Sequence, residues 1–200
     1  GTLRGMGAPG FMAYWIGGAV FLLEYTFWYA PELRAFALLV LQVDFALIML
    51  SAGIYKYSAG DSLNNGMELG LVNPAWGYWW RKYAQVRPNH WVFRFMNQTA
   101  WMTEIAMAVL MILPPTRLWG GLLMAMSFVF VWSQIRLGFL CEMLVIVGLL
   151  YVVPISFAVP VATSPAPETS FASLSVFNSV VEVALWCYIV ALPFAHAGLY

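Results

Sequence analysis

Six apolar stretches, separated by short turns with proline, glycine or charged residues, dominate this chain. They cover residues 11–30, 35–55, 95–113, 118–134, 137–153 and 174–195. About 20 apolar residues in a helix are enough to cross the hydrocarbon core of a bilayer. Because lipid offers the backbone no hydrogen-bond partner, such a segment must be helical. We therefore predict an all-α fold, a polytopic integral membrane bundle with about six transmembrane helices. The short segment 133–138 leaves two alternatives, a tight turn that gives six helices or a polar kink that gives five.

The composition agrees with a lipid environment. Hydrophobic residues make up 62% of the chain and charged residues 9%, with a mean hydropathy of +0.79, whereas a soluble domain is about half apolar and a quarter charged. Nine basic and nine acidic residues cancel, so we do not expect a nucleic-acid partner. The expected partners are the lipid bilayer and other membrane subunits. We expect one transmembrane domain over residues 1–200, compatible with a longer chain, in a membrane such as the bacterial inner membrane.

The segment 56–94 differs from the rest because it gathers Gly, Asn, Pro, aromatic and basic residues. Tryptophan, lysine and arginine favour the headgroup level of a bilayer. We predict that this segment is an interfacial loop with short helices, anchored by Trp76, Trp79, Trp80, Arg81 and Lys82. Short loops rich in Lys and Arg usually face the cytoplasm, and this segment also contains Arg87 and Arg94. We therefore predict that it is cytoplasmic.

Five acidic residues and one arginine lie within or beside the predicted spans: Glu24, Asp44, Glu104, Glu142, Glu182 and Arg136. A charge at bilayer depth costs on the order of 3 kcal/mol or more, so we expect these side chains to be buried against a partner or water. One interpretation is that they join helices through hydrogen bonds and ion pairs. The other is a proton or ion path, which would make the chain a proton-coupled transporter.

Histidines, cysteines and aromatic residues give weaker signals. His90 and His196 are the only histidines, and we interpret them as structural in preference to pigment or haem ligands. Cys141 and Cys187 lie in apolar runs without a CxxC spacing, so we expect small buried hydrophobic residues and predict no metal site. Aromatic residues form 17% of the chain. They fit a quinone or pigment pocket, although an aromatic belt with helix packing explains them as well.

One stretch resembles a known membrane family. The sequence Ala-Gly-Ile-Tyr-Lys-Tyr at residues 52–57 ends a predicted helix, and Asp61, Gly66, Met67, Glu68 and Leu71 follow it. Further on come Glu104, then Pro114 and Arg117, and a helix over 138–150. Over residues 40–153 this pattern is similar to the vitamin K-dependent γ-carboxylase and its bacterial relatives, the horizontally transferred transmembrane (HTTM) family.

The resemblance implies a role for Lys56. In the carboxylase the matching lysine is the base that starts oxygenation of vitamin K hydroquinone, and Glu104 would orient it. A lysine amine at a helix end can act as a base when burial favours its neutral form. Three features depart from the family: residues 127–134 contain no His, the 200 residues contain no large β-rich domain, and the basic loop after Lys56 predicts a cytoplasmic face where the carboxylase works on the exported side.

Because of these departures, our leading hypothesis is an accessory or assembly subunit of a larger membrane complex on an HTTM-like scaffold, with a lipid or quinone contact. We favour a role other than catalysis. The first alternative is a carboxylase-like enzyme with Lys56 as base and Glu104 as orienting carboxylate. The second is a transporter that uses the five acidic residues.

Overall fold

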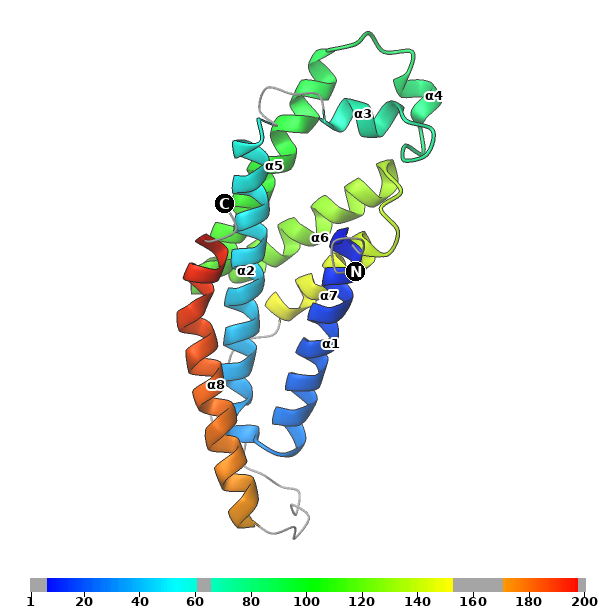
Figure 1. Ribbon diagram of the computed structural model, residues 1–200. Helices are drawn as coiled ribbons and strands as arrows, with labels where there is room; N and C mark the ends of the chain where they lie inside the picture. The colour runs from blue at the N-terminus through cyan, green and yellow to red at the C-terminus, as the bar shows by residue number, and fades with distance from the viewer. Residues whose placement is uncertain (1–6, 61–65, 153–170, 198–200) are drawn as a thin grey trace.

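The fold is all-helical throughout the described part of the chain, residues 7–60, 66–152 and 171–197 of a computed structural model (Figure 1). The α-helices are α1 (Gly7–Trp28), α2 (Arg34–Ser58), α3 (Gly66–Val72), α4 (Trp80–Tyr83), α5 (Trp91–Ile112), α6 (Arg117–Gln134), α7 (Leu140–Gly148) and α8 (Phe171–Ala197). Three short 3-10 helices complete them, η2 (Pro31–Leu33), η3 (Pro114–Thr116) and η4 (Leu149–Tyr151). The six predicted apolar stretches correspond to α1, α2, α5, α6, α7 with η4, and α8, while α3 and α4 lie in the predicted loop 56–94.

Prolines and glycines set the ends of the helices, as the sequence predicted. Pro31 starts η2 and separates α1 from α2. Leu113 is extended before Pro114, the conformation that a following proline favours. Between α6 and α7, Ile135 is extended and Gly138 has a positive φ of 61°. The segment 133–138 is therefore a turn between two helices, which decides against a kink in one continuous helix.

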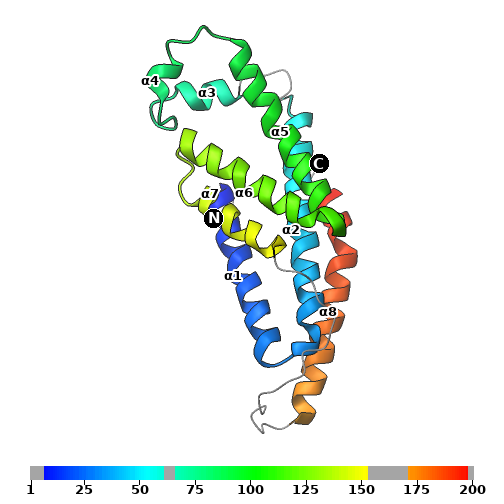
Figure 2. The same ribbon diagram turned by 180° about the vertical axis from the view of Figure 1, so that it is seen from behind.

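Helix α2 is the central element (Figures 1 and 2). It runs antiparallel to α1 and α5, and α8 lies along it on another side. Helices α6 and α7 form a second hairpin that crosses beside α2 and α5. The main core lies where α2, α5, α6 and α7 meet, and its most buried members include Phe45, Met49, Met107, Met111, Met124 and Val147.

Glycines bring α6 against its neighbours. A Cβ added at Gly120 would lie 2.7 Å from the Met111 nitrogen of α5. A Cβ added at Gly121 would lie 2.9 Å from the carbonyl oxygen of Gly148 and 2.7 Å from the Cβ of Tyr151. All three distances are too short for a side chain, so the close approach of these helices depends on glycine.

Two helices are long and apolar enough to cross a membrane, judged by length and composition over the described residues. They are η2 with α2, Pro31–Ser58, and η3 with α6, Pro114–Gln134. Two further apolar stretches, Leu140–Tyr151 and Val176–Ala191, are shorter. These helices are consistent with a membrane location.

Candidate functional site

Lys56 and Glu104, the two residues of the carboxylase-like alternative, are in contact. Lys56 lies in the last turn of α2, and its amine donates to the Oε1 of Glu104 on α5. The pair sits where the two helices approach closely, because a Cβ at Gly53 would lie 2.7 Å from Ile105 Cγ1. The Glu104 side chain is 10% exposed and that of Lys56 is 37% exposed. The arrangement is an ion pair between two helices, with a half-buried lysine and a nearly buried glutamate.

Asp44 joins three helices. It is 3% exposed, and its Oδ2 accepts hydrogen bonds from Trp15 Nε1 of α1 at 2.8 Å and from the Tyr188 hydroxyl of α8 at 3.0 Å. A buried carboxylate is expensive unless it is hydrogen-bonded. The contacts support the interpretation of Asp44 as a residue that joins helices.

Gln42, which the sequence analysis did not single out, is the centre of a second buried polar network. It is 1% exposed, and its Nε2 donates to the carbonyl oxygen of Leu150 at 2.7 Å. Its Oε1 accepts from Arg117 Nη1 at 3.3 Å, and its backbone oxygen accepts from the Tyr151 hydroxyl at 2.6 Å. The available signal was an amide within an otherwise apolar stretch, two residues before Asp44.

Three of the charged residues predicted to be buried are exposed in the single chain. Glu24 on α1 and Glu182 on α8 face outward, as does Arg136 between α6 and α7. The physical reason is position: α1 and α8 lie at the edge of the bundle, and Arg136 lies in a turn. Glu24 accepts from Trp28 Nε1 at 3.1 Å one helical turn away.

Glu142 is partly buried in the first turn of α7, and its Oε2 has no hydrogen-bond partner among the described residues. The partners named above for Asp44, Glu104 and Glu24 are aromatic or lysine side chains, none of them another acid.

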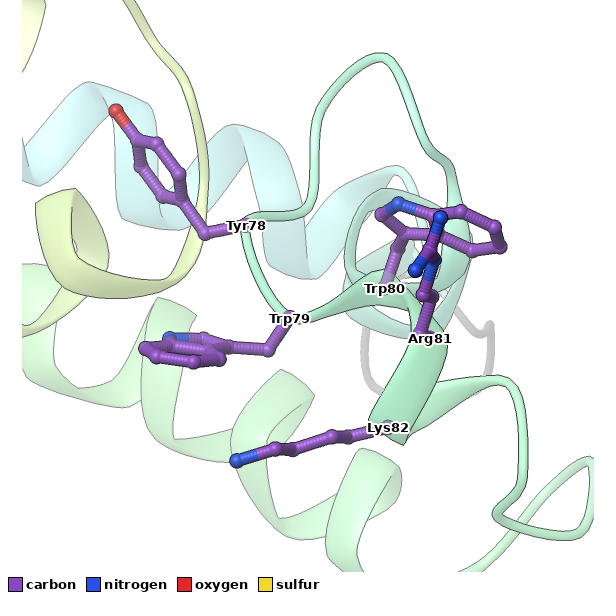
Figure 3. Close-up of a pocket in the computed structure, with 5 residues that line it drawn as sticks. All are labelled: Tyr78, Trp79, Trp80, Arg81 and Lys82. Carbon is purple, nitrogen blue, oxygen red and sulfur yellow. The ribbon is translucent and has the colours of Figure 1, made fainter.

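The predicted interfacial anchors form an exposed aromatic and basic surface. Five consecutive residues line an open hollow of about 380 Å³, namely Tyr78, Trp79, Trp80, Arg81 and Lys82 (Figure 3). Each ring has a cation beside it: Lys82 Nζ lies 4.7 Å from the Trp79 ring centre, Arg81 Cζ 5.4 Å from that of Trp80, and Arg136 Cζ 5.0 Å from that of Tyr78. Trp76, also predicted as an anchor, is 49% exposed and is not among the residues that line the hollow. We call the five residues that line the hollow, together with Arg136, the aromatic–basic surface.

Backbone hydrogen bonds fix this surface to the end of α6. The Tyr78 amide donates to the Gln134 carbonyl oxygen at 3.0 Å, and the Arg136 amide donates to that of Trp76 at 2.7 Å. Trp79 Nε1 adds a bond to the Ser133 carbonyl oxygen at 3.1 Å. Gly77 lies between these contacts, where any Cβ would collide with the Leu71 carbonyl oxygen.

Tyr83 adds a side-chain contact between the loop and α6. Its hydroxyl donates to Gln134 Oε1 at 2.9 Å. Burial raises the pKa of Tyr83 above its ordinary value of 10.0, because the phenolate would lose hydration. The phenol is therefore protonated, and able to donate this bond, at neutral pH.

The histidines and cysteines have different outcomes. His90 is the N-cap of α5, and its Nδ1 accepts from the Val92 amide at 3.3 Å, in agreement with a structural role. The side chain of His196 lies outside the described residues. Cys141 is buried as predicted, whereas Cys187 is exposed because it lies on an outward side of α8.

No family model matches the chain, and neither a curated protein nor a solved structure matches it. Fold and site define the class over the described residues: an all-helical protein with two candidate membrane spans, two buried polar networks between helices, the ion pair of Lys56 with Glu104 and an aromatic–basic surface at the end of α6.

Proposed function

We propose that this chain is an integral membrane protein with six membrane-crossing helices on an HTTM-like scaffold, and that it serves as an accessory subunit of a larger membrane complex. The observation that carries the proposal is a pair of carboxylates exposed on otherwise apolar helices. Glu182 lies on α8, where Val180 and Val183 are 57% and 60% exposed. Glu24 lies on α1 near Phe21, which is 72% exposed.

These outward surfaces suit lipid except at the two acids. Apolar side chains facing outward are expected in a bilayer, where lipid tails solvate them. A charged group facing lipid at that depth costs on the order of 3 kcal/mol. A neighbouring subunit with a hydroxyl, amide or basic group at the same depth would remove this cost. The exposed carboxylates thus support contact with another membrane protein at α1 and α8.

The same proposal includes orientation. The segment 56–94 contains Arg81, Lys82, Arg87 and Arg94, and an excess of such residues in a short loop favours the cytoplasmic side. With six crossings, the N-terminus and the C-terminus would then both lie on the cytoplasmic side. A cysteine-labelling experiment with a membrane-impermeant maleimide on intact cells tests this, since a cysteine at Arg87 should stay unlabelled until the cells are opened.

Photocrosslinking in native membranes tests the subunit role. A photoreactive residue replacing Glu182 should yield one discrete protein adduct, while the same residue replacing Val180, on the opposite side of α8, should yield adducts with lipid alone. Purification in mild detergent should bring down the same partner in stoichiometric amount. A monomer with no protein adduct at position 182 would contradict the proposal.

A second candidate is the carboxylase-like enzyme, and the contact between Lys56 and Glu104 is the observation that favours it. Purified protein in detergent would be supplied with vitamin K hydroquinone and oxygen, and epoxide formation measured. If Lys56 is the base, Lys56→Ala abolishes turnover while the protein remains folded, and Arg87→Ala, a change to another exposed cation, does not. Absence of epoxide with the unaltered protein would refute this candidate.

A further inference from the structure

The aromatic–basic surface has a composition that suits an anionic ligand. Its cations are Arg81, Lys82 and Arg136, and no described carboxylate forms an ion pair with any of them. Each cation lies instead beside an aromatic ring at about 5 Å. Cation–π contacts orient the cations and leave their positive charge uncompensated, so an anion can still bind them.

The position of the surface points to the source of that anion. The Tyr78 amide donates to the Gln134 carbonyl oxygen and the Trp76 carbonyl oxygen accepts from the Arg136 amide, which fixes the hollow at the end of α6. Among the described residues, α6 is one of two helices long and apolar enough to cross a membrane. A group fixed at the end of a crossing helix lies at the level of the lipid headgroups. Three indole and phenol rings there can reach the boundary between acyl chains and headgroups.

The hollow is also large enough for part of a lipid. Its volume is about 380 Å³, within the range of small-molecule sites. In Figure 3 the Arg81 side chain lies beside the Trp80 ring and Lys82 extends below Trp79, so the lining contains two ring–cation pairs.

We propose that this hollow binds the headgroup of an anionic phospholipid, with Arg81 and Lys82 contacting the phosphate and the rings of Trp79 and Trp80 packing against the glycerol and upper acyl chain. Arginine supplies several N–H donors in a planar fork that matches phosphate oxygens, and lysine adds a point charge. The site rests on the proposed crossing of α6, and it is independent of whether the chain has a partner subunit.

Native mass spectrometry of the full chain in detergent can measure the site directly. Phosphatidylglycerol and phosphatidylcholine with identical acyl chains are added, and bound lipid is counted as its concentration rises. The unaltered protein should retain one phosphatidylglycerol at concentrations where phosphatidylcholine is lost. Each basic residue near a membrane surface contributes about fivefold to binding of anionic lipid, so Arg81→Gln with Lys82→Gln should weaken phosphatidylglycerol binding by at least about tenfold.

A matched control separates a site from general charge. The double variant Arg87→Gln with Arg94→Gln also removes two positive charges, from exposed positions in the same segment. It should change binding by less than about threefold. Equal losses in the two double variants, no loss in either, or equal retention of the two lipids would overturn the proposal. Displacement of the lipid by millimolar inorganic phosphate would also overturn it, because the site would then recognise free phosphate.

Membrane integration is measured separately, by resistance of the chain to alkaline carbonate extraction. Loss of lipid selectivity in a protein that stays in the membrane contradicts the site alone. Extraction of the chain contradicts the membrane placement on which both proposals rest. A circular dichroism spectrum unchanged by the double substitution shows that reduced binding does not come from unfolding.

Discussion

The α5–α6–α7 region and the outer helices α1 and α8 contact the rest of the chain in different ways. In the first region glycines allow backbones to touch, and large apolar side chains such as Met111 and Met124 fill the space. The outer helices bury few side chains, Leu185 on α8 and Met12, Ala19 and Thr26 on α1. Their contacts combine ring packing, such as that of Trp186 against Phe36, with hydrogen bonds to Asp44 and Asn178. Close approach of backbones thus distinguishes the inner helices, and hydrogen bonds with a few apolar contacts position the outer ones.

The largest effect should come from filling a glycine contact. Gly121→Ala places a methyl group against Tyr151 and Gly148, and overpacking of this kind lowers the free energy of unfolding by about 1–3 kcal/mol. Gly17→Ala on α1 is the control, because a Cβ there meets nothing within 4 Å. It should be neutral or stabilise the helix by up to about 1 kcal/mol. Thermal unfolding in detergent measures both, and equal destabilisation would remove the contrast between the two regions.

Removing the carboxylate of Asp44 should have the next largest effect, and it should act on the outer helices. Asp44→Ala leaves Trp15 Nε1 and the Tyr188 hydroxyl without their acceptor, at a cost of about 2 kcal/mol. Asp44→Asn keeps an acceptor oxygen and should cost less. Limited proteolysis should show α8 cleaved more readily in Asp44→Ala, with α5 and α6 unchanged. Uniform protection of all helices would show that Asp44 does not position α8.

A smaller effect is expected at the direct hydrogen bond between α1 and α8. The Tyr25 hydroxyl donates to Asn178 Oδ1 at 2.7 Å, and Tyr25→Phe removes this bond at a cost of about 1 kcal/mol. Tyr14→Phe on the same helix serves as control because Tyr14 is 64% exposed. A double variant with Asn178→Ala should show that the two changes are not additive. Full additivity would mean that the bond contributes nothing.

The smallest effect concerns pH and the loop at the end of α6. Burial raises the pKa of Tyr83 above 10.0, so above pH 10 the undocked loop loses a proton that the docked loop retains. Docking should therefore weaken as the pH rises through this range, with full strength below it. Tryptophan fluorescence between pH 8 and 11 follows the change. This pH-dependent change in fluorescence should be lost in Tyr83→Phe. It should persist in Tyr78→Phe, since Tyr78 is exposed.

The sequence predicted the helices because their signals are local. Apolar stretches of bilayer length and prolines at 31 and 114 determine where helices begin and end, without reference to other parts of the chain. Lys56 and Glu104 are 48 positions apart in the sequence, and only the family resemblance suggested that they lie near each other.

The hydrogen-bond partners could not be predicted, because they lie far apart in the sequence. Asp44 contacts Tyr188 across 144 positions, and Gln42 contacts Leu150 across 108. The exposure of Glu24 and Glu182 was also hidden, since α1 and α8 are apolar on all sides and have no polar stripe that indicates which side faces outward.

The pairing of residues 76–78 with residues 134–136 has a consequence for how the protein is made. A ribosome releases the loop long before it has synthesised Gln134, and the amide of Tyr78 has no acceptor there until that residue emerges. The nascent loop must therefore remain undocked while α5 and α6 are synthesised. Its assembly is completed from the C-terminal side, so a chain truncated before residue 134 would carry Trp79, Trp80, Arg81 and Lys82 without Arg136 and without the backbone partners that arrange them.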